Sequence, residues 1–358
     1  MTMDLTHAGS YGRLKVVKER FLKNDIIDKL SGSGKDEFIK LLGSTSYRKE
    51  IDELSGLYEM PDLVEVVINA HMAGMIKIAT IGLAPLSKEF IAAYVSKWDI
   101  ENIKTVLSSK ALGYSVENTD VFLIVQRSMP VGIFSGMMAR DDFRKLIEEK
   151  DIEGIAKALL RYGYGTVLLK YIDDAKNKDV TKMIAALDLF YFTRLLQSYK
   201  PYDSAKDSIL KFIRESIDIK NITTALKARD YGQKDIKEFI INGGTLQDVR
   251  IEKFISAKPE DLGALMPYDV GAAIELYKRS GTISHIEIAL RMELYRKYLK
   301  QFESAPISLE FVLAFIIRCE IERDELRSIW FAKYYNIGKE SAQGMQILTF
   351  SGGKSGII

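Results

Sequence analysis

The chain has 358 residues, of which 47% are hydrophobic and 28% are charged, which is the composition of an ordinary soluble globular protein. This length exceeds the usual single core of about 100–200 residues, so we expect two or three structural units. The 51 basic and 49 acidic residues are interspersed and give a formal net charge of +2. There is no basic block of the kind that nucleic-acid-binding proteins carry, so we expect no nucleic-acid partner.

An all-α fold is predicted, because the chain has only seven prolines and almost no segment alternates with the period of two that strands show. The exception is Met345–Phe350, which has β propensity and precedes a Gly/Ser tail. The two most apolar windows, residues 63–86 and 121–138, are interrupted by charged or polar side chains. We expect both to be core helices that do not span a membrane. The single cysteine, Cys319, excludes an intramolecular disulfide and follows an apolar run, which predicts a buried core residue.

The predicted elements recur along the chain in the order short helices, long helix, apolar helix and capped helix. The recurring ranges are 38–47, 90–95 and 99–113, then 155–162, 187–194, 209–213 and 218–232, and finally 262–268, 286–295, 311–317 and 322–333. This order predicts three similar helical units, at residues 1–118, 119–234 and 235–358, the last with a flexible C-terminal tail.

A repeated segment supports this division most directly. Asp99–Gly113 returns at residues 218–232, where seven of the fifteen positions are identical. A third, weaker copy occupies Glu322–Lys333. Repetition at this spacing is typical of one supersecondary unit used several times, and it favours a function that depends on shape.

Each copy has the pattern of a helix start. An acidic residue at the N-cap can accept the free amide hydrogens of the first turn, and a polar residue three positions later can bond back toward the cap. The six residues of this structural helix-cap motif are Asp99 and Asn102, Asp218 and Asn221, and Glu322 and Glu325. If both aspartates are caps, replacing either by alanine should lower stability by about 0.5–2 kcal/mol.

The end of each copy is also predicted by a residue type. Gly113 and Gly232 close the first two copies, and Asn336 stands near that place in the third. Glycine, and less often asparagine, adopts the left-handed conformation that ends a helix. We therefore expect these three residues to terminate their helices.

Two stretches imitate a phosphate-binding loop but lack a part that it needs. In Ser31–Lys35 the lysine is followed by Asp36, where a hydroxyl side chain would hold magnesium. In residues 352–355 only three residues follow Ser355, so the required helix cannot form. We expect neither a nucleotide site nor a bound cofactor.

Catalytic and metal-binding patterns are likewise missing from the sequence. The two adjacent carboxylates Asp173 and Asp174 would not share a helix face. No nucleophile motif or zinc-protease motif occurs, and the three histidines are far apart, without cysteine or glutamate at ligand spacing: His7, His71 and His285. His71, on an apolar helix, is predicted to be a core residue. We expect no catalytic residue and no metal ligand.

The chain resembles the C subunits of archaeal-type (A-type/V-type) ATP synthases, the counterparts of the d subunits in eukaryotic vacuolar ATPases. The resemblance covers nearly the whole chain and rests on Tyr11–Lys15, on 41–47, on 99–113 with its copy, and on Glu322–Ile329. Glu325 departs from the pattern, because the earlier copies have asparagine there.

That resemblance implies an all-helical funnel of three subdomains around a pseudo-threefold axis. It implies a non-catalytic part of a rotary motor, bound peripherally on the cytoplasmic side of the cell membrane. There the protein would link the membrane rotor ring to the central-stalk subunits and transmit torque between ion transport and ATP synthesis. Neither a cofactor nor a small-molecule substrate is implied.

Two other hypotheses about the function are compared with the rotary coupling subunit. A helical scaffold that binds a protein partner would usually have repeats of about 34–47 residues, whereas the main spacing here is 119 residues. A helical enzyme with a site between units would need converging titratable groups, and the sequence pairs none.

Overall fold

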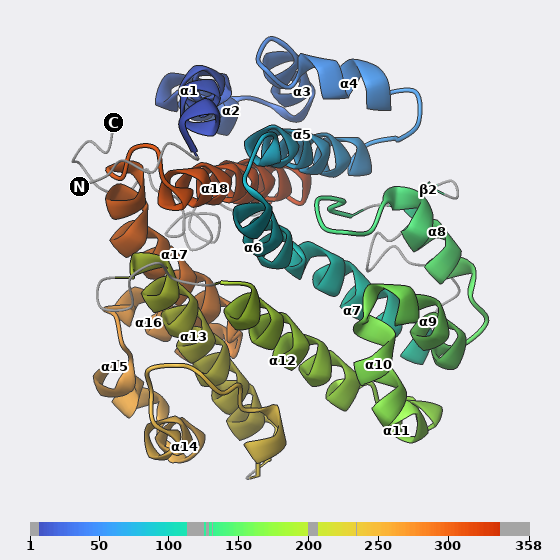
Figure 1. Ribbon diagram of the computed structural model, residues 1–358, viewed down its shortest axis with the longest axis vertical. Helices are drawn as coiled ribbons and strands as arrows, with labels where there is room; N and C mark the ends of the chain where they lie inside the picture. The colour runs from blue at the N-terminus through green and yellow to red at the C-terminus, as the bar shows by residue number, and fades with distance from the viewer. Residues whose placement is uncertain are drawn as a thin grey trace.

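The computed structural model describes residues 7–112, 125–126, 129–130, 132–199, 207–233 and 235–336. These residues form an all-α protein, as predicted (Figure 1). Two residue pairs, β1 (Val125–Gln126) and β2 (Met129–Pro130), form a short antiparallel ladder. The expected core helix at 121–138 is therefore wrong, since none of its described residues is helical. The predicted boundary at residue 118, Gly113 and the strand-like run Met345–Phe350 lie outside the described residues.

The helices follow the predicted order along the chain, except that the apolar and the capped helix are one helix in the second and third copies. Those up to residue 112 are α1 (Ala8–Val17), α2 (Asn24–Gly32), α3 (Lys35–Gly43), α4 (Arg48–Leu54), α5 (Asp62–Thr80), α6 (Pro85–Val95) and α7 (Lys97–Ala111). Next come α8 (Arg140–Glu148), α9 (Ile152–Ala158), α10 (Tyr164–Leu168), α11 (Ile172–Lys176), α12 (Thr181–Ser198) and α13 (Ser208–Asp230). The remaining ones are α14 (Asp248–Ser256), α15 (Leu262–Leu265), α16 (Gly271–Ser280), α17 (Ser284–Glu303) and α18 (Leu309–Tyr334). Short 3₁₀ helices lie at Lys18–Arg20, Leu159–Tyr162, Leu169–Tyr171, Lys237–Phe239 and Pro259–Asp261.

The helix-cap interpretation of the repeat is wrong for the second and third copies. The predicted apolar and capped helices are there a single helix, α13 or α18, so that Asp218, Asn221, Glu322 and Glu325 lie far from its N-terminus. The side chains that cap these helices are those of Asp207 and Ser308, which accept the N–H groups of Leu210 and Phe311. No glycine or proline separates the two predicted elements in either unit, so nothing ends the first helix before the repeat.

In the first copy the apolar and the repeat helix are separate, but the aspartate is again not the N-cap. Helices α6 and α7 are separated at Ser96, whose hydroxyl donates to the carbonyl of Ala93. Ser96 is the N-cap of α7, and Asp99 lies in the first turn without capping its own helix. Asn102 lies one turn further on. The correction therefore applies to all six residues of the motif.

The predicted helix ends are confirmed where the structure describes them. Gly232 follows α13 with φ of +70°, and Asn336 follows α18 with φ of +52°. The N–H of Gln233 donates to the carbonyl of Ala228 at 2.8 Å, which closes the end of α13 in the manner of a Schellman motif. Left-handed backbone at these positions explains the glycine and the asparagine.

Each long helix packs against the last helix of the unit before it. Helix α12 lies against α6 and α7, and α17 lies against α13. Helix α5 closes the series by packing along α18, so that elements near the two ends of the chain lie side by side (Figure 1). The contacts among α5, α18, α17, α13, α12, α7 and α6 thus connect the beginning of the described chain to its end.

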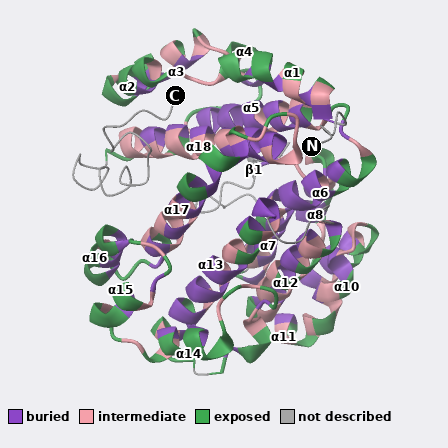
Figure 2. Cartoon of the chain, turned by 60° about the vertical axis from the view of Figure 1, so that its left-hand side comes forward, coloured by how far each residue is buried: buried purple, intermediate pink, exposed green. Residues whose placement is uncertain are grey.

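The buried hydrophobic residues of these helices form two cores. The larger one runs through α6, α7, α12, α13, α17 and the first half of α18. A separate smaller core joins helices α2 to α5 to the C-terminal half of α18, with Phe38, Leu42 and Trp330 at its centre. Figure 2 shows the buried residues along α5, α13 and α18 and the exposed ones on peripheral helices such as α14 and α16.

Among the described residues, α5 is the one helix long and apolar enough to cross a membrane. Of its most apolar window, 67% is buried inside the protein, and its buried residues include Glu65, Asn69 and His71. These features are those of a core helix, in line with the expectation for residues 63–86. His71 and Cys319 are buried, which confirms both predictions of core residues.

Candidate functional site

The aspartates of the repeat bind backbone groups of a loop that follows their own helix. Asp218 on α13 accepts the N–H groups of Thr245 and Leu246 at 2.8 and 3.0 Å, and it also accepts the hydroxyl of Thr245. Asp99 on α7 accepts the N–H groups of Met137 and Met138 at 2.7 and 3.4 Å. The two carboxylates therefore accept N–H groups in the segments just before α8 and α14.

The asparagines bind the same two loops a few residues earlier. Asn221 donates to the carbonyl of Ile241 and accepts its N–H, both at 2.9 Å. Asn102 makes the same pair of bonds with Ile133, at 2.7 and 3.4 Å. A side-chain amide that matches both groups of one residue imitates the pairing of a neighbouring strand.

The acidic residue of the third copy binds groups near the N-terminus of the chain. Glu322 on α18 accepts the N–H of Leu22 at 2.6 Å and the hydroxyl of Tyr47 at 2.7 Å. Glu325, one turn later, is half-buried beside it. Helix α18 is thereby hydrogen-bonded to the N-terminal part of the chain.

The three contacts are equivalent in position. Met138, Leu246 and Leu22 each stand immediately before the N-cap of a helix, namely α8, α14 and α2. In each case the acidic residue of the repeat accepts the N–H of this residue. We call the six residues Asp99, Asn102, Asp218, Asn221, Glu322 and Glu325 the junction motif, because its acidic residues bind the segments that lead into α8, α14 and α2.

Glycine is required at the point of closest approach. A Cβ atom on Gly244 would lie 2.2 Å from Oδ1 of Asp218, and one on Gly136 would lie equally close to Oδ1 of Asp99. The carboxylates cannot move aside without losing their hydrogen bonds. The loops Ile133–Met138 and Ile241–Leu246 share an Ile-x-x-Gly pattern for this reason.

Gly244→Ala is expected to lower the free energy of unfolding by about 2–4 kcal/mol, because the new methyl group displaces a buried acceptor from its donors. Urea unfolding followed by circular dichroism measures the change. The control is Gly12→Ala on α1, where no atom lies within 4 Å of the added carbon and the change should be neutral or slightly stabilising. Equal effects of the two substitutions would contradict the role given to Gly244.

Burial changes the titration of the junction carboxyls. It raises the pKa of Asp99 to about 6, although the N–H groups of Met137 and Met138 and the hydroxyl of Tyr164 act in the opposite direction. The pKa of Glu322 is also raised, again mainly by burial. Neither carboxyl is placed for proton transfer, because each is occupied by donors of the protein itself.

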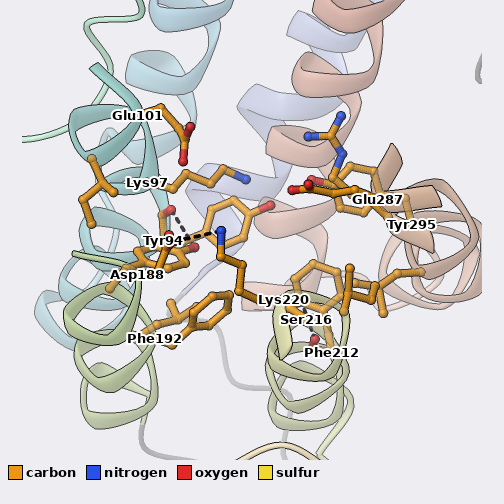
Figure 3. Close-up of a pocket in the computed structure, with 16 residues that line it drawn as sticks. Tyr94, Lys97, Glu101, Asp188, Phe192, Phe212, Ser216, Lys220, Glu287 and Tyr295 are labelled. Carbon is orange, nitrogen blue, oxygen red and sulfur yellow. Dashed lines mark hydrogen bonds and ion pairs between the residues drawn. The ribbon is translucent and has the colours of Figure 1, made fainter. Parts of the chain in front are cut away.

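A cavity of about 180 Å³ lies where α6, α7, α12, α13 and α17 converge (Figure 3). Aromatic and aliphatic side chains make up part of its wall. The charged ones come from all three predicted units and are balanced in sign: Lys97, Glu101, Asp188, Lys220, Glu287 and Arg291.

Each basic side chain that lines this cavity forms an ion pair with a carboxylate. Asp188 on α12 lies 2.9 Å from Nζ of Lys220 on α13 (Figure 3). It also lies 2.6 Å from Nζ of Lys104 on α7. Lys97 pairs with Glu320 at 2.7 Å. Arg291, in the same way, lies 2.8 Å from Asp324. Two of these ion pairs, Asp188 with Lys104 and Lys97 with Glu320, therefore join helices of different predicted units.

The pKa values agree with this pairing. Burial alone would raise the pKa of Asp188, but Lys220 and Lys104 hold it below its ordinary value. The pKa of Lys220 is raised, because Asp188 and Glu287 outweigh the opposing effect of burial. Within the described part of the chain, no group of His, Cys, Asp or Glu residues could hold a metal ion. The arrangement fits a structural role.

Comparison with known proteins agrees with this geometry. A family model described as ATP synthase (C/AC39) subunit matches residues 10–345. The chain belongs to the ATP synthase (C/AC39) subunit family. Members of this family are structural subunits and are not themselves catalytic.

The similarity to individual relatives covers almost the whole chain. The C subunit of the A-type ATP synthase of Thermoplasma volcanium is 36% identical, and the match covers 96% of this chain and 99% of the relative. That of Thermoplasma acidophilum is 35% identical with the same coverage. That of Archaeoglobus fulgidus is 30% identical over 94% of each chain. The chain is therefore a subunit of an ATP synthase, a complex associated with a membrane.

Several residues of this C/AC39 chain could have been found in the sequence and were missed. The repeated segment ends at the glycines that close the helices, whereas Gly136 and Gly244 lie in the loops beyond. These loops repeat at a shift of 108 residues, as Ile133 and Ile241 do. This second spacing of 108 residues, beside the spacing of 119, is the sequence signal for Gly136 and Gly244. Asp188 carries no such signal, because no copy of it stands in the other units.

Proposed function

We propose that the chain is the non-catalytic coupling subunit of an A-type or V-type rotary ATP synthase. It links the membrane rotor ring to the central-stalk subunits and transmits torque between proton or sodium transport and ATP synthesis or hydrolysis. It lies peripherally on the cytoplasmic side of the membrane. Membership of the C/AC39 family and the names of the relatives support this proposal.

The proposed architecture is a funnel of three units, at residues 1–118, 119–234 and 235–358, around a pseudo-threefold axis. Three equivalent contacts of the junction motif support it, as does the packing of each long helix on the last helix of the preceding unit. The charged residues around the central cavity, which come from all three proposed units, support it as well.

The single observation that carries the proposal is the closure of the circuit, in which Glu322 on α18 accepts the N–H of Leu22 across 300 positions of sequence. A coupling part must turn without bending. An open row of helical units bends at its ends, whereas a closed circuit spreads a load over every junction. Closed packing of this kind suits torque better than it suits simple binding.

The test is binding of the full-length chain to each proposed partner. We expect it to be retained by rotor-ring particles in detergent and, separately, by the central-stalk pair, and to hydrolyse no ATP alone. Binding to both partners supports coupling. Binding to one alone would leave a helical scaffold for a protein partner, and binding to neither folded partner would overturn the proposal.

A further inference from the structure

The three helices that carry the repeat all end on a large apolar side chain that is exposed. Leu112, Tyr231 and Tyr335 are the C-caps of α7, α13 and α18, and each stands 13 residues after the acidic residue of the junction motif. Their exposed fractions are 59%, 87% and 55%. We call these three the tip residues. Single exposed apolar residues are common on protein surfaces, but here one recurs at the same position of every copy.

Another strongly exposed apolar residue does not recur in this way. Val249 is 65% exposed and stands two positions after the N-cap of α14. The residues at the same place in α8 and α2 are Asp141 and Asp25. Exposure of an apolar side chain there belongs to one copy alone, whereas exposure at the tips belongs to all three.

A basic residue two positions before each tip fixes the end of the helix. These residues are Lys110, Arg229 and Lys333. Arg229 donates to the carbonyl of Ala257 at 3.3 Å, and Lys333 donates to that of Ser33 at 2.5 Å. Both carbonyls belong to C-caps, those of α14 and α2, where partial negative charge favours a cation. A tip beside a fixed backbone loses little conformational freedom when a partner binds it.

The three tips also stand in equivalent surroundings. Helix α7 packs against the long helix α12, α13 against α17, and α18 against α5. Helices with matching neighbours present their ends in the same direction relative to those neighbours. In the proposed arrangement around a pseudo-threefold axis, the three tips therefore lie at one end of the funnel and at equal distances from the axis.

We propose that Leu112, Tyr231 and Tyr335 are the residues with which this chain contacts the membrane rotor ring. The inference rests on the proposed coupling function and names the surface that meets one of its two partners. A ring of identical subunits repeats the same surface around its axis, so it can receive three similar tips. The central-stalk pair is a single partner and does not offer one surface three times.

The side chains indicate the chemistry of the receiving surface. Leu112 lacks the hydroxyl group that Tyr231 and Tyr335 carry, so what the tips share is apolar area and not a hydrogen bond. Lys110 and Lys333 form no ion pair within the described residues, and their charges favour carboxylates at the edge of the contact. The ring surface is therefore apolar at each contact, with an acidic rim.

Binding of the full-length chain to rotor-ring particles in detergent tests the proposal. Replacing Leu112, Tyr231 or Tyr335 singly by alanine should weaken ring binding about fivefold to tenfold in each case, and replacing all three should weaken it about a hundredfold or more. Binding to the central-stalk pair should not change. Because these side chains are exposed, the variants should unfold at the same urea concentration as the wild type. If the triple variant fails to fold, the three single variants still decide.

Two controls make the test specific. Val249→Ala removes a similarly exposed apolar side chain and should bind the ring like the wild type. Detergent particles without the ring should retain none of the proteins. Retention by such empty particles that the triple variant abolishes would mean that the tips bind detergent, and it would overturn the proposal.

Failure of this inference can be told apart from failure of the coupling function. If the wild type binds the ring and the triple variant binds it as tightly, the tips are not the contact and the coupling function stands. An effect of one tip alone would overturn the threefold contact, and loss of stalk binding in place of ring binding would assign the tips to the other partner. A wild-type chain that binds neither partner would overturn the coupling function and this inference with it.

Discussion

Asp218→Ala is expected to lower the free energy of unfolding by about 3–5 kcal/mol. The carboxylate is 3% exposed and accepts two backbone N–H groups and the hydroxyl of Thr245. Its removal takes away three hydrogen bonds to a charged acceptor, two from the exposed Thr245 and one from the half-buried Leu246. Each hydrogen bond to a charged group contributes about 1.5–3 kcal/mol, partly offset by water that reaches the freed donors.

Urea unfolding of the full-length chain measures this loss. The control is Asp248→Ala, because Asp248 is exposed in the first turn of α14 and should contribute at most about 1 kcal/mol through the helix dipole. A loss for Asp218→Ala of only about 0.5–2 kcal/mol is what a helix cap would give, and it would argue against a junction. The two interpretations thus differ in magnitude as well as in mechanism.

Much of the architecture could be predicted from the sequence because it depends on local patterns. Helical periodicity, few prolines and the residues that end helices, such as Gly232 and Asn336, act over a few positions. The repeat shows that a unit recurs. These signals are sufficient for an all-α chain with three copies of one element.

The role of the repeat could not be predicted, because a cap and a junction use the same chemistry. In both, a carboxylate accepts backbone N–H groups. The two roles differ only in whether the helix begins at the carboxylate or several residues before it. That start depends on residues 214–217 and 318–321, which continue the helix because neither stretch contains a glycine or proline. The donors lie on other elements, and Leu22 is 300 residues away from Glu322.

The central charges were beyond prediction for another reason. Interspersed charges are usual on a solvated surface, which is how composition alone describes Asp188 and Lys220. Tertiary packing places both in the interior, where each side chain is less than a quarter exposed. A charge is retained there only with a partner, and the partner comes from another helix.

Asp188→Ala is the second substitution expected to have a large effect, about 3–5 kcal/mol lost from the free energy of unfolding. Asp188 lies between Lys104 on α7 and Lys220 on α13, and the side chains are 13%, 12% and 22% exposed. Alanine would leave two lysines beside each other without a counter-charge. The loss then exceeds that of an exposed pair, which is worth at most about 1 kcal/mol.

Unfolding measured as a function of pH separates this ion pair from simple packing. The pKa of Asp188 lies below its ordinary 3.8, so its contribution is present above pH 3.8 and is lost as pH falls through the value in the folded protein. The variant should lack this part of the acid dependence. Glu53→Ala, which breaks the exposed pair with Lys49, is the control and should change stability little. Adding Lys220→Met to Asp188→Ala should recover part of the loss, because it removes one unpaired charge. No recovery would mean that the lost stability came from packing around α12 and not from the charges that join the units.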